Sequence, residues 1–192
     1  MANLDQLEQV EVDSRQAWRS WLAGNYTQSD SIWLVTYKKH TGDRYLPYDA
    51  IVEEALCFGW IDSLPRRLDE DRTMLLLSPR KAKSVWSKLN KSRVERLISE
   101  GRMMPPGLEK VEQAKANGTW TFLDDVEALV IPEDLAVALA GDEVARANFE
   151  GFSDSTKKGI LQWIKMAKRS QTRQRRIKET IEQAAIGEKV LG

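Results

Sequence analysis

The sequence predicts an α+β fold, with a small antiparallel sheet flanked by helices and a C-terminal all-helical module. Two observations lead to this class. Up to about residue 118, segments with helical or strand patterns follow one another in the order α-β-α-β-β-α-α. From about residue 123 onward, only helical patterns remain. A chain of 192 residues has room for one or two domains, and we place them at residues 1–122 and 123–192.

Four helices are predicted in the first module, each from apolar residues at helical spacing between a start signal and a stop signal. Serine, aspartate and asparagine cap helix starts, proline fits the first turn, and glycine ends helices. The expected start and stop residues are Asp13 or Ser14 with Gly24, Pro47 with Gly59, Asn90 with Gly101, and Pro105 with Asn117.

Three strands are predicted in the same module. Ile32–Tyr37 is apolar on both alternating faces and rich in β-forming residues, which is typical of a central strand. A polar turn at residues 40–43 follows it. Residues 60–68 and 73–77 flank Asp69-Glu-Asp71, and this arrangement predicts a β-hairpin.

The C-terminal module follows an acidic stretch at residues 124–127, which we expect to act as the junction. Its apolar residues repeat at helical spacing, and proline, glycine and capping residues separate the repeats. The predicted helices are residues 135–139, residues 144–149, a helix capped by Asp154 and a helix capped by Thr172.

The net charge of zero, from 29 basic and 29 acidic residues, hides an uneven distribution. Residues 66–102 contain 11 basic and 5 acidic side chains, residues 119–153 contain 1 and 8, and residues 154–192 contain 10 and 4. We expect the acidic segment to neutralise the basic C-terminal helices. The basic segment Ser78–Asn90 is then the one left open to solvent.

The composition excludes several chemistries. One cysteine, Cys57, allows no internal disulfide, and with one histidine, His40, the usual zinc ligand sets are absent. We therefore expect neither a metal nor a cofactor. The N-terminal residues lack the features of a secretory signal, and no apolar stretch reaches the roughly 18 residues of a membrane span. These features predict a cytoplasmic protein.

The segment Ser78–Asn90 is the strongest candidate for a ligand site, because it places hydroxyls, cations and an indole between a strand and a helix. Hydroxyls and an arginine fork suit an anion such as phosphate, and an indole can stack on a base or sugar. The alternative is a structural loop in which Trp86 seals the core and the lysines are solvated. The ligand-binding candidates are Arg80, Ser84, Trp86, Ser87 and Asn90.

Asp62 is a further ligand-binding candidate, since it lies at the start of a strand directly after a helix, where polar groups can face a cleft. With Glu53 or Glu54 it could supply general acid–base chemistry, but pairing with an arginine or with backbone amides is the alternative. Cys57 and His40 could form a nucleophile and its base, but a buried core cysteine is the alternative. Nothing in the spacing requires catalysis, so no catalytic residue is assigned.

Nucleic-acid binding is the alternative function for the basic blocks, residues 66–102 and 154–192. Two helices joined by a short turn in the second block are compatible with a helix-turn-helix arrangement. The competing interpretation pairs the cations of residues 165–178 with the acidic segment 119–153. We expect this internal pairing, and no nucleic-acid partner.

Five motifs resemble those of a known bacterial family. They are Ala55–Ser63 (ALCFGWIDS), Leu77–Lys81 (LSPRK), Ser84–Asn90 (SVWSKLN), Gly101–Met103 (GRM) and Thr172–Ile177 (TRQRRI). Together they resemble the YdeI/OmpD-associated family, also called bacteriocin-protection proteins, over residues 15–186. The resemblance implies a link to bacterial stress, to tolerance of cationic antimicrobial peptides and to an outer-membrane porin. It implies no catalytic residue, and family members are often placed in the periplasm, although this chain shows no export signal.

The residues and the resemblance together predict a non-enzymatic binding protein. Its small anionic or peptidic ligand would lie in the Ser78–Asn90 loop, and an envelope-stress component would be its partner. The alternatives are nucleic-acid binding through the two basic blocks and an enzyme that acts on a small substrate. The deciding observation is whether Arg80, Ser84, Trp86 and Asn90 line a pocket or are buried and mutually satisfied.

Overall fold

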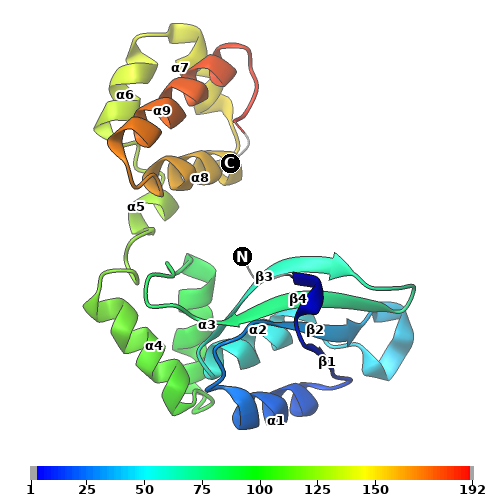
Figure 1. The fold of residues 1–192 in the computed structure, drawn as a ribbon. Helices are drawn as coiled ribbons and strands as arrows, with labels where there is room; N and C mark the ends of the chain where they lie inside the picture. Colours follow the sequence, from blue (N-terminus) through cyan, green and yellow to red (C-terminus); the bar gives the residue numbers. More distant parts are fainter. Residues whose placement is uncertain (1–3, 191–192) are drawn as a thin grey trace. The chain divides into compact units, whose positions relative to one another are not determined.

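The computed structural model describes residues 4–190, and residues 1–3 and 191–192 lie outside the described part. The N-terminal segment is expected to lack a secretory signal, and its first three residues lie outside the described part. The chain forms two compact units that divide between Thr121 and Phe122 (Figure 1). In the described residues, unit 1 contains a sheet with helices and unit 2 contains helices alone. The predicted α+β class with a helical C-terminal region is confirmed.

Unit 1 is built on a four-stranded sheet formed by β1 (Gln9–Glu11), β2 (Ile32–Tyr37), β3 (Trp60–Arg67) and β4 (Arg72–Pro79). The strand order is β1-β2-β4-β3. β4 pairs antiparallel with both β2 and β3, so the predicted hairpin is present. β1 pairs parallel with β2, which makes the sheet mixed and corrects the prediction of a purely antiparallel one. Three residues are too few to show an alternating pattern in the sequence.

Over residues 4–121, two 3₁₀ segments and four α-helices accompany the sheet. They are η1 (Leu4–Gln6), α1 (Arg15–Asn25), η2 (Lys39–Arg44), α2 (Tyr48–Cys57), α3 (Lys88–Ser99) and α4 (Pro105–Ala116). The Ser14 hydroxyl caps α1 by accepting a hydrogen bond from the Ala17 N–H, as predicted. The cap of α3 is Ser87 and not Asn90, because the Ser87 hydroxyl accepts from the Asn90 N–H. Asn90 therefore lies in the first turn of the helix.

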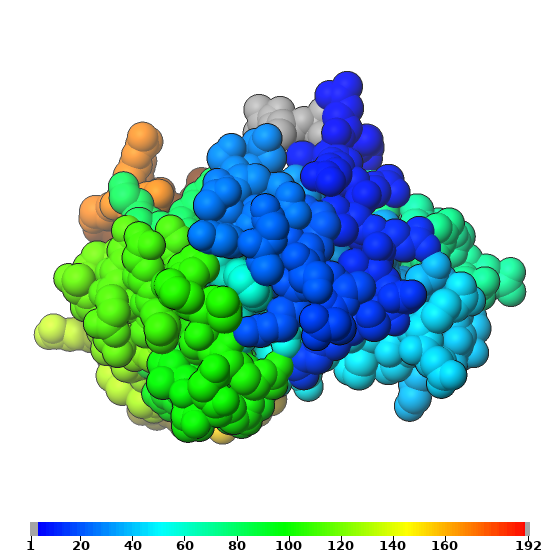
Figure 2. Space-filling view, turned by 90° about the horizontal axis from the view of Figure 1, so that it is seen from below, coloured from blue at the N-terminus to red at the C-terminus, as the bar shows by residue number. Residues whose placement is uncertain are grey.

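The larger hydrophobic core of unit 1 lies between one face of the sheet and the helices. Trp18 of α1 and Trp86, which precedes α3, are almost fully buried in it. The Trp18 indole N–H donates to the Ile51 carbonyl at 3.1 Å and so joins α1 to α2. Figure 2 looks onto the side of this unit that carries α1 (blue) and α4 (green). The opposite face of the sheet carries a smaller cluster, Trp33, Val35 and Met74.

Unit 2 consists of α5 (Asp124–Glu127), α6 (Glu133–Ala140), α7 (Glu143–Gly151), α8 (Asp154–Lys165) and α9 (Ser170–Ala185). The acidic stretch expected to be a junction forms the short helix α5. Ser153, one residue before the predicted Asp154, caps α8 through its hydroxyl. Thr172 lies inside α9, which begins after Arg169 without a side-chain cap. None of the helices between residues 4 and 190 is long and apolar enough to cross a bilayer.

Candidate functional site

Arg80 follows β4 and is the central residue of the predicted ligand loop. Its backbone N–H donates to the Gly59 carbonyl at 2.8 Å, which extends the pairing of the hairpin by one residue. The side chain is only 3% exposed. Its Nη2 donates to the Val85 carbonyl at 3.0 Å, and its Cζ lies 3.6 Å from the centre of the Trp86 ring. The loop therefore folds back onto the guanidinium that precedes it.

Two nitrogens of this guanidinium, Nε and Nη1, are buried and have no hydrogen-bond partner among the described residues. A buried donor left without an acceptor costs about 1–3 kcal/mol, and more when it belongs to a charged group. Burial lowers the pKa of Arg80 to about 10, and the negative charge of Asp62 opposes this shift. The group therefore remains cationic at neutral pH and stands as a buried charge without an ion-pair partner among the described carboxylates.

Asp62 lies near Arg80 but is engaged elsewhere. The Tyr48 hydroxyl donates to the Asp62 carboxylate at 2.6 Å. Burial and this contact raise the pKa of Tyr48 to about 12, so the hydroxyl keeps its proton and remains a donor. Asp62 thus contributes a nearby negative charge without neutralising Arg80 through a direct bond.

Of the other predicted residues of the loop, only Trp86 contacts the Arg80 side chain. Trp86 is buried and packs against Trp120, with ring centres 5.0 Å apart, so it fills the core as the alternative interpretation held. Ser87 and Asn90 meet each other at the start of α3, where Asn90 also accepts from Arg93 at 2.9 Å. The structure therefore joins Arg80 with Trp86 and places Ser87 and Asn90 in a helix cap.

The middle of the loop is a turn at the surface. The Ser84 N–H donates to the Lys81 carbonyl at 2.9 Å, and the Asn117 side-chain amide donates to the Ala82 carbonyl at 2.8 Å. Lys81 and Lys83 are exposed, whereas Arg80 and Trp86 at the two ends are buried. The expectation of an open segment thus holds in part, for residues 81–83 and for Lys88 and Leu89 in the first turn of α3.

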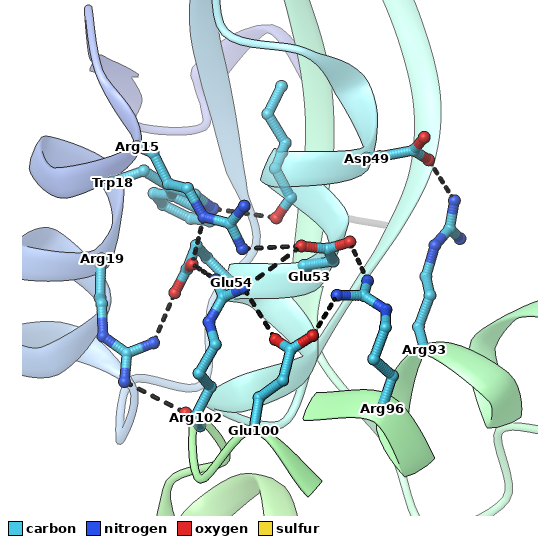
Figure 3. A network of polar contacts seen from close by, with 11 residues as sticks. Arg15, Trp18, Arg19, Asp49, Glu53, Glu54, Arg93, Arg96, Glu100 and Arg102 are labelled. Atoms are coloured by element: carbon cyan, nitrogen blue, oxygen red, sulfur yellow. Dashed lines mark hydrogen bonds and ion pairs between the residues drawn. The ribbon is translucent and has the colours of Figure 1, made fainter. Parts of the chain in front are cut away.

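A second cluster surrounds two adjacent glutamates of α2 (Figure 3). Glu54 is 1% exposed. Its Oε1 accepts from Arg15 Nε at 2.6 Å and from Arg102 Nη2 at 2.5 Å, and its Oε2 accepts from Arg19 Nη1 at 2.6 Å. Three guanidinium groups thus hold one buried carboxylate. They come from α1 and from the segment after α3, so the cluster joins both to α2.

The neighbouring Glu53 completes the network. It accepts from Arg15 Nη2 at 2.7 Å and from Arg96 Nη2. Arg96 and Arg102 both also reach Glu100, at 3.0 Å and 3.3 Å. Each of the three carboxylates, Glu53, Glu54 and Glu100, is bound by more than one arginine. The network therefore connects α1, α2 and α3 through ion pairs.

The residues considered for acid–base or nucleophilic chemistry are engaged in other contacts or buried. A general base needs an oxygen that can reach a substrate proton, and both oxygens of Glu54 are occupied by guanidinium donors. His40, on η2, is bound to Asp71 at 2.9 Å. Cys57, at the end of α2, is fully buried. Within residues 4–190, no group of three or more His, Cys, Asp or Glu side chains is placed to hold a metal ion.

We expect the Cys57 thiol to be inert in the folded protein. Burial and the negative charge of Glu54 raise the pKa of Cys57 to about 11, and Arg19 offsets this only in part. Because the thiolate is the reactive form, alkylation by iodoacetamide at about pH 8 should be at least about 100-fold slower than in the unfolded chain. The single cysteine makes the measurement unambiguous, and rapid alkylation under native conditions would contradict it.

The basic blocks are largely paired within their own units. In unit 1, Arg66 pairs with Asp5, and Arg72 pairs with both Asp69 and Glu11. The counter-charges are thus not those of residues 119–153. In unit 2, the expected pairing with the acidic segment is present: Lys158 with Glu127, Lys165 with Asp125 and Arg173 with Asp134. The hydrogen bond from Arg173 lowers the pKa of the Asp134 carboxyl.

Two family models match separate parts of the chain, and the gap between the two matches contains the boundary between the two units. Residues 10–110, more than half of the chain, match the family described as a domain of unknown function (DUF8412). The chain belongs to this family. Residues 128–187 match the family described as "Bacteriocin-protection, YdeI or OmpD-Associated", which confirms the family indicated by the sequence motifs. No significant match to a curated protein or to a solved structure is found.

The two matches refine the resemblance. The YdeI/OmpD-associated match covers residues 128–187, a narrower stretch than the expected residues 15–186. Of the five motifs, Thr172–Ile177 lies inside it, and the other four lie within the DUF8412 match. Arg80 and the glutamate network therefore belong to the DUF8412 part of the chain.

Sequence reasoning missed the four arginines of the glutamate network, Arg15, Arg19, Arg96 and Arg102. One local signal could have indicated them. Glu53 and Glu54 interrupt a run of apolar residues between Val52 and Ala55. Buried charges need partners, so two adjacent carboxylates at buried positions predict several nearby arginines, although not which ones.

Proposed function

We propose that the protein is a non-enzymatic binding protein of the YdeI/OmpD-associated type and that Arg80 holds an anionic ligand. The observation that carries the proposal is the buried, unneutralised guanidinium with two unpaired nitrogens. A buried arginine with a structural role normally donates its hydrogen bonds to carboxylates, as Arg15 and Arg19 do. The free donors of Arg80 favour an acceptor that the chain itself does not supply.

The geometry defines the chemistry of the ligand. The guanidinium nitrogens are donors only, so the ligand must present acceptor oxygens, and a negative charge would also compensate the buried cation. The Trp86 ring covers one face of the guanidinium. The ligand oxygens must therefore approach in the guanidinium plane, where the N–H groups point. A phosphate or carboxylate group meets these requirements.

Access to Arg80 requires movement of the turn at residues 81–85. That turn is exposed over residues 81–83, and Val85 is bound to Arg80 through a single carbonyl. A ligand oxygen can replace this carbonyl without breaking a strand or a helix. Lys81 and Lys83 add positive charge at the surface, which raises the local concentration of anions.

The proposal is tested by titration calorimetry of the full chain with inorganic phosphate, a sugar phosphate, acetate and polymyxin B. We expect a phosphate or carboxylate probe to bind the unchanged protein, and Arg80→Met to weaken that binding at least about tenfold. Arg67→Gln is the matched control, because it removes an exposed cation from the same unit, and it should leave the affinity unchanged.

Stability separates a ligand-binding arginine from a structural one. Arg80→Met keeps the apolar stem and removes a buried charge that lacks a partner, a change that is often neutral or stabilising. We therefore expect its free energy of unfolding to be unchanged or higher. A loss of about 3 kcal/mol or more would assign Arg80 a structural role. Absence of binding by every anionic probe, or binding of phosphate that Arg80→Met does not change, would also overturn the proposal.

A further inference from the structure

We propose that unit 2 contains a second binding site, a groove along α8 that takes an organic anion with an apolar part. The groove encloses about 590 Å³, which lies within the usual range for small-molecule sites. Its lining follows α8 from Ser155 to Met166, the residue directly after the helix, which corresponds to a length of roughly 16 Å at 1.5 Å per residue. Arg176 of α9 and the C-terminal residues Lys189 and Val190 form the rest of the lining.

Among the described residues, the charged side chains that line the groove are all basic. Arg176 and Lys189 line it, and no carboxylate is among its lining residues. The Nη1 of Arg176 donates to the Trp163 carbonyl, and its Cζ lies 4.9 Å from the centre of the Trp163 ring. The Nε of Arg176 is buried and has no partner among the described residues. An anionic group in the groove would compensate the positive charge of Arg176 and contact the exposed side chain of Lys189.

Part of the lining next to these cations is apolar, while Ser155, Thr156 and Gln162 supply polar groups. Ile160, Trp163, Met166 and Val190 line the groove, and Met166 remains 44% exposed. An exposed methionine beside a partly exposed indole is an adaptable surface for rings and alkyl chains. A small inorganic anion would leave this surface in water, so the geometry favours a ligand that combines a charged group with an apolar body.

Gly159 keeps the groove open. It lies on α8 and lines the groove, and a Cβ at this position would meet nothing within 4 Å. Its backbone is helical and needs no positive φ, so a larger side chain fits the helix and projects into open space. In a helix interior glycine is less favourable than leucine by about 0.5–1 kcal/mol. A substitution here can therefore fill the groove without harming the fold.

The groove lies in unit 2 and the proposed anion site at Arg80 lies in unit 1, and the two sites differ in their residues and ligands. The proposal for the groove does not depend on the proposal for Arg80. The Arg80 site has donors buried under a turn and an indole, and it fits a small oxyanion. The groove offers apolar side chains with cations beside them. Binding at one site can be lost while binding at the other is retained.

The test is titration calorimetry of the full chain with 2-naphthoate, decanoate, 2-naphthylmethanol and inorganic phosphate. We expect an organic anion to bind and 2-naphthylmethanol, which has the rings without the charge, to bind at least about fivefold more weakly. Tighter binding of 2-naphthoate would identify an aromatic ligand, and tighter binding of decanoate an alkyl one. Phosphate, which has charge without an apolar body, should not compete for the groove.

Two glycine variants locate the binding. Gly159→Leu should weaken binding of the organic anion at least about tenfold while leaving the free energy of unfolding unchanged or higher. Gly24→Leu is the matched control, because Gly24 is also a helical glycine with nothing within 4 Å of a Cβ and lies in α1 of unit 1. Lys189→Gln should weaken binding of the anion but not of the alcohol. Failure of both organic anions to bind, or equal binding by the unchanged protein and Gly159→Leu, would overturn the proposal.

Discussion

Gly107→Ala is expected to destabilise unit 1 by about 3 kcal/mol or more. Gly107 lies in the first turn of α4 and is buried against the end of α2. A Cβ on Gly107 would lie 2.3 Å from the Cys57 carbonyl oxygen and 2.7 Å from that of Leu56. Both atoms are backbone, so no side-chain rotation relieves the clash. α4 would have to move away from α2, and core contacts such as those of Val111 and Ala114 would loosen.

Urea denaturation followed by circular dichroism measures this loss. Gly24→Ala is the matched control, because it adds the same methyl group to a helix where a Cβ meets nothing within 4 Å. That control should be neutral or stabilising by up to about 1 kcal/mol. An unchanged denaturation midpoint for Gly107→Ala would show that α4 does not pack against α2 as closely as the structure has it.

The parts of the fold that the sequence predicts well are those encoded by local patterns. β2 runs over Ile32–Tyr37 as predicted, because six consecutive β-forming residues bounded by polar turns suit a buried strand better than a helix. The hairpin of β3 and β4 also follows from its polar turn. β1 was missed because its three residues become a strand only through parallel pairing with β2.

The helix caps show a second limit. Ser87 and Asn90 are both good capping residues, and the sequence alone does not decide between them. The structure selects Ser87, whose extended backbone lets its hydroxyl receive the Asn90 N–H. The same ambiguity applies to α8, for which the sequence predicts Asp154 as the cap and the structure has Ser153. The starts of α3, α8 and α9 are thus shifted by one to three residues, although all three are helices as predicted.

The candidate site could be predicted only in part, for a physical reason. Arg80 stands out in the sequence as an arginine among serines, but its burial and its unpaired nitrogens depend on how the loop folds back. The capping role of Ser87 depends on where α3 begins. The partners of Glu54 come from positions 15, 19 and 102, which only the packing of α1 and α3 against α2 brings together.

Glu54→Gln is the second substitution for which we expect a large loss of stability. The amide has nearly the shape of the carboxylate, so packing in α2 is preserved. It replaces one acceptor oxygen with an NH₂ group, which places donors against the guanidinium groups of Arg15, Arg19 and Arg102. Removing one partner of a buried ion pair costs about 3–5 kcal/mol. These arginines are 28–36% exposed and can recover some hydration, so we expect about 2–4 kcal/mol.

Glu95→Gln is the control, because Glu95 is an exposed glutamate of α3 and the chemical change is the same. Its effect should stay within about 0.5 kcal/mol. Since Glu54 is buried, the loss in Glu54→Gln should persist at about 1 M salt, where exposed ion pairs are screened. Urea denaturation of both variants at low and high salt checks this. A loss that disappears in salt would mean that the carboxylate is hydrated in solution, and that α1, α2 and α3 are held together by apolar contacts and not by the glutamate network.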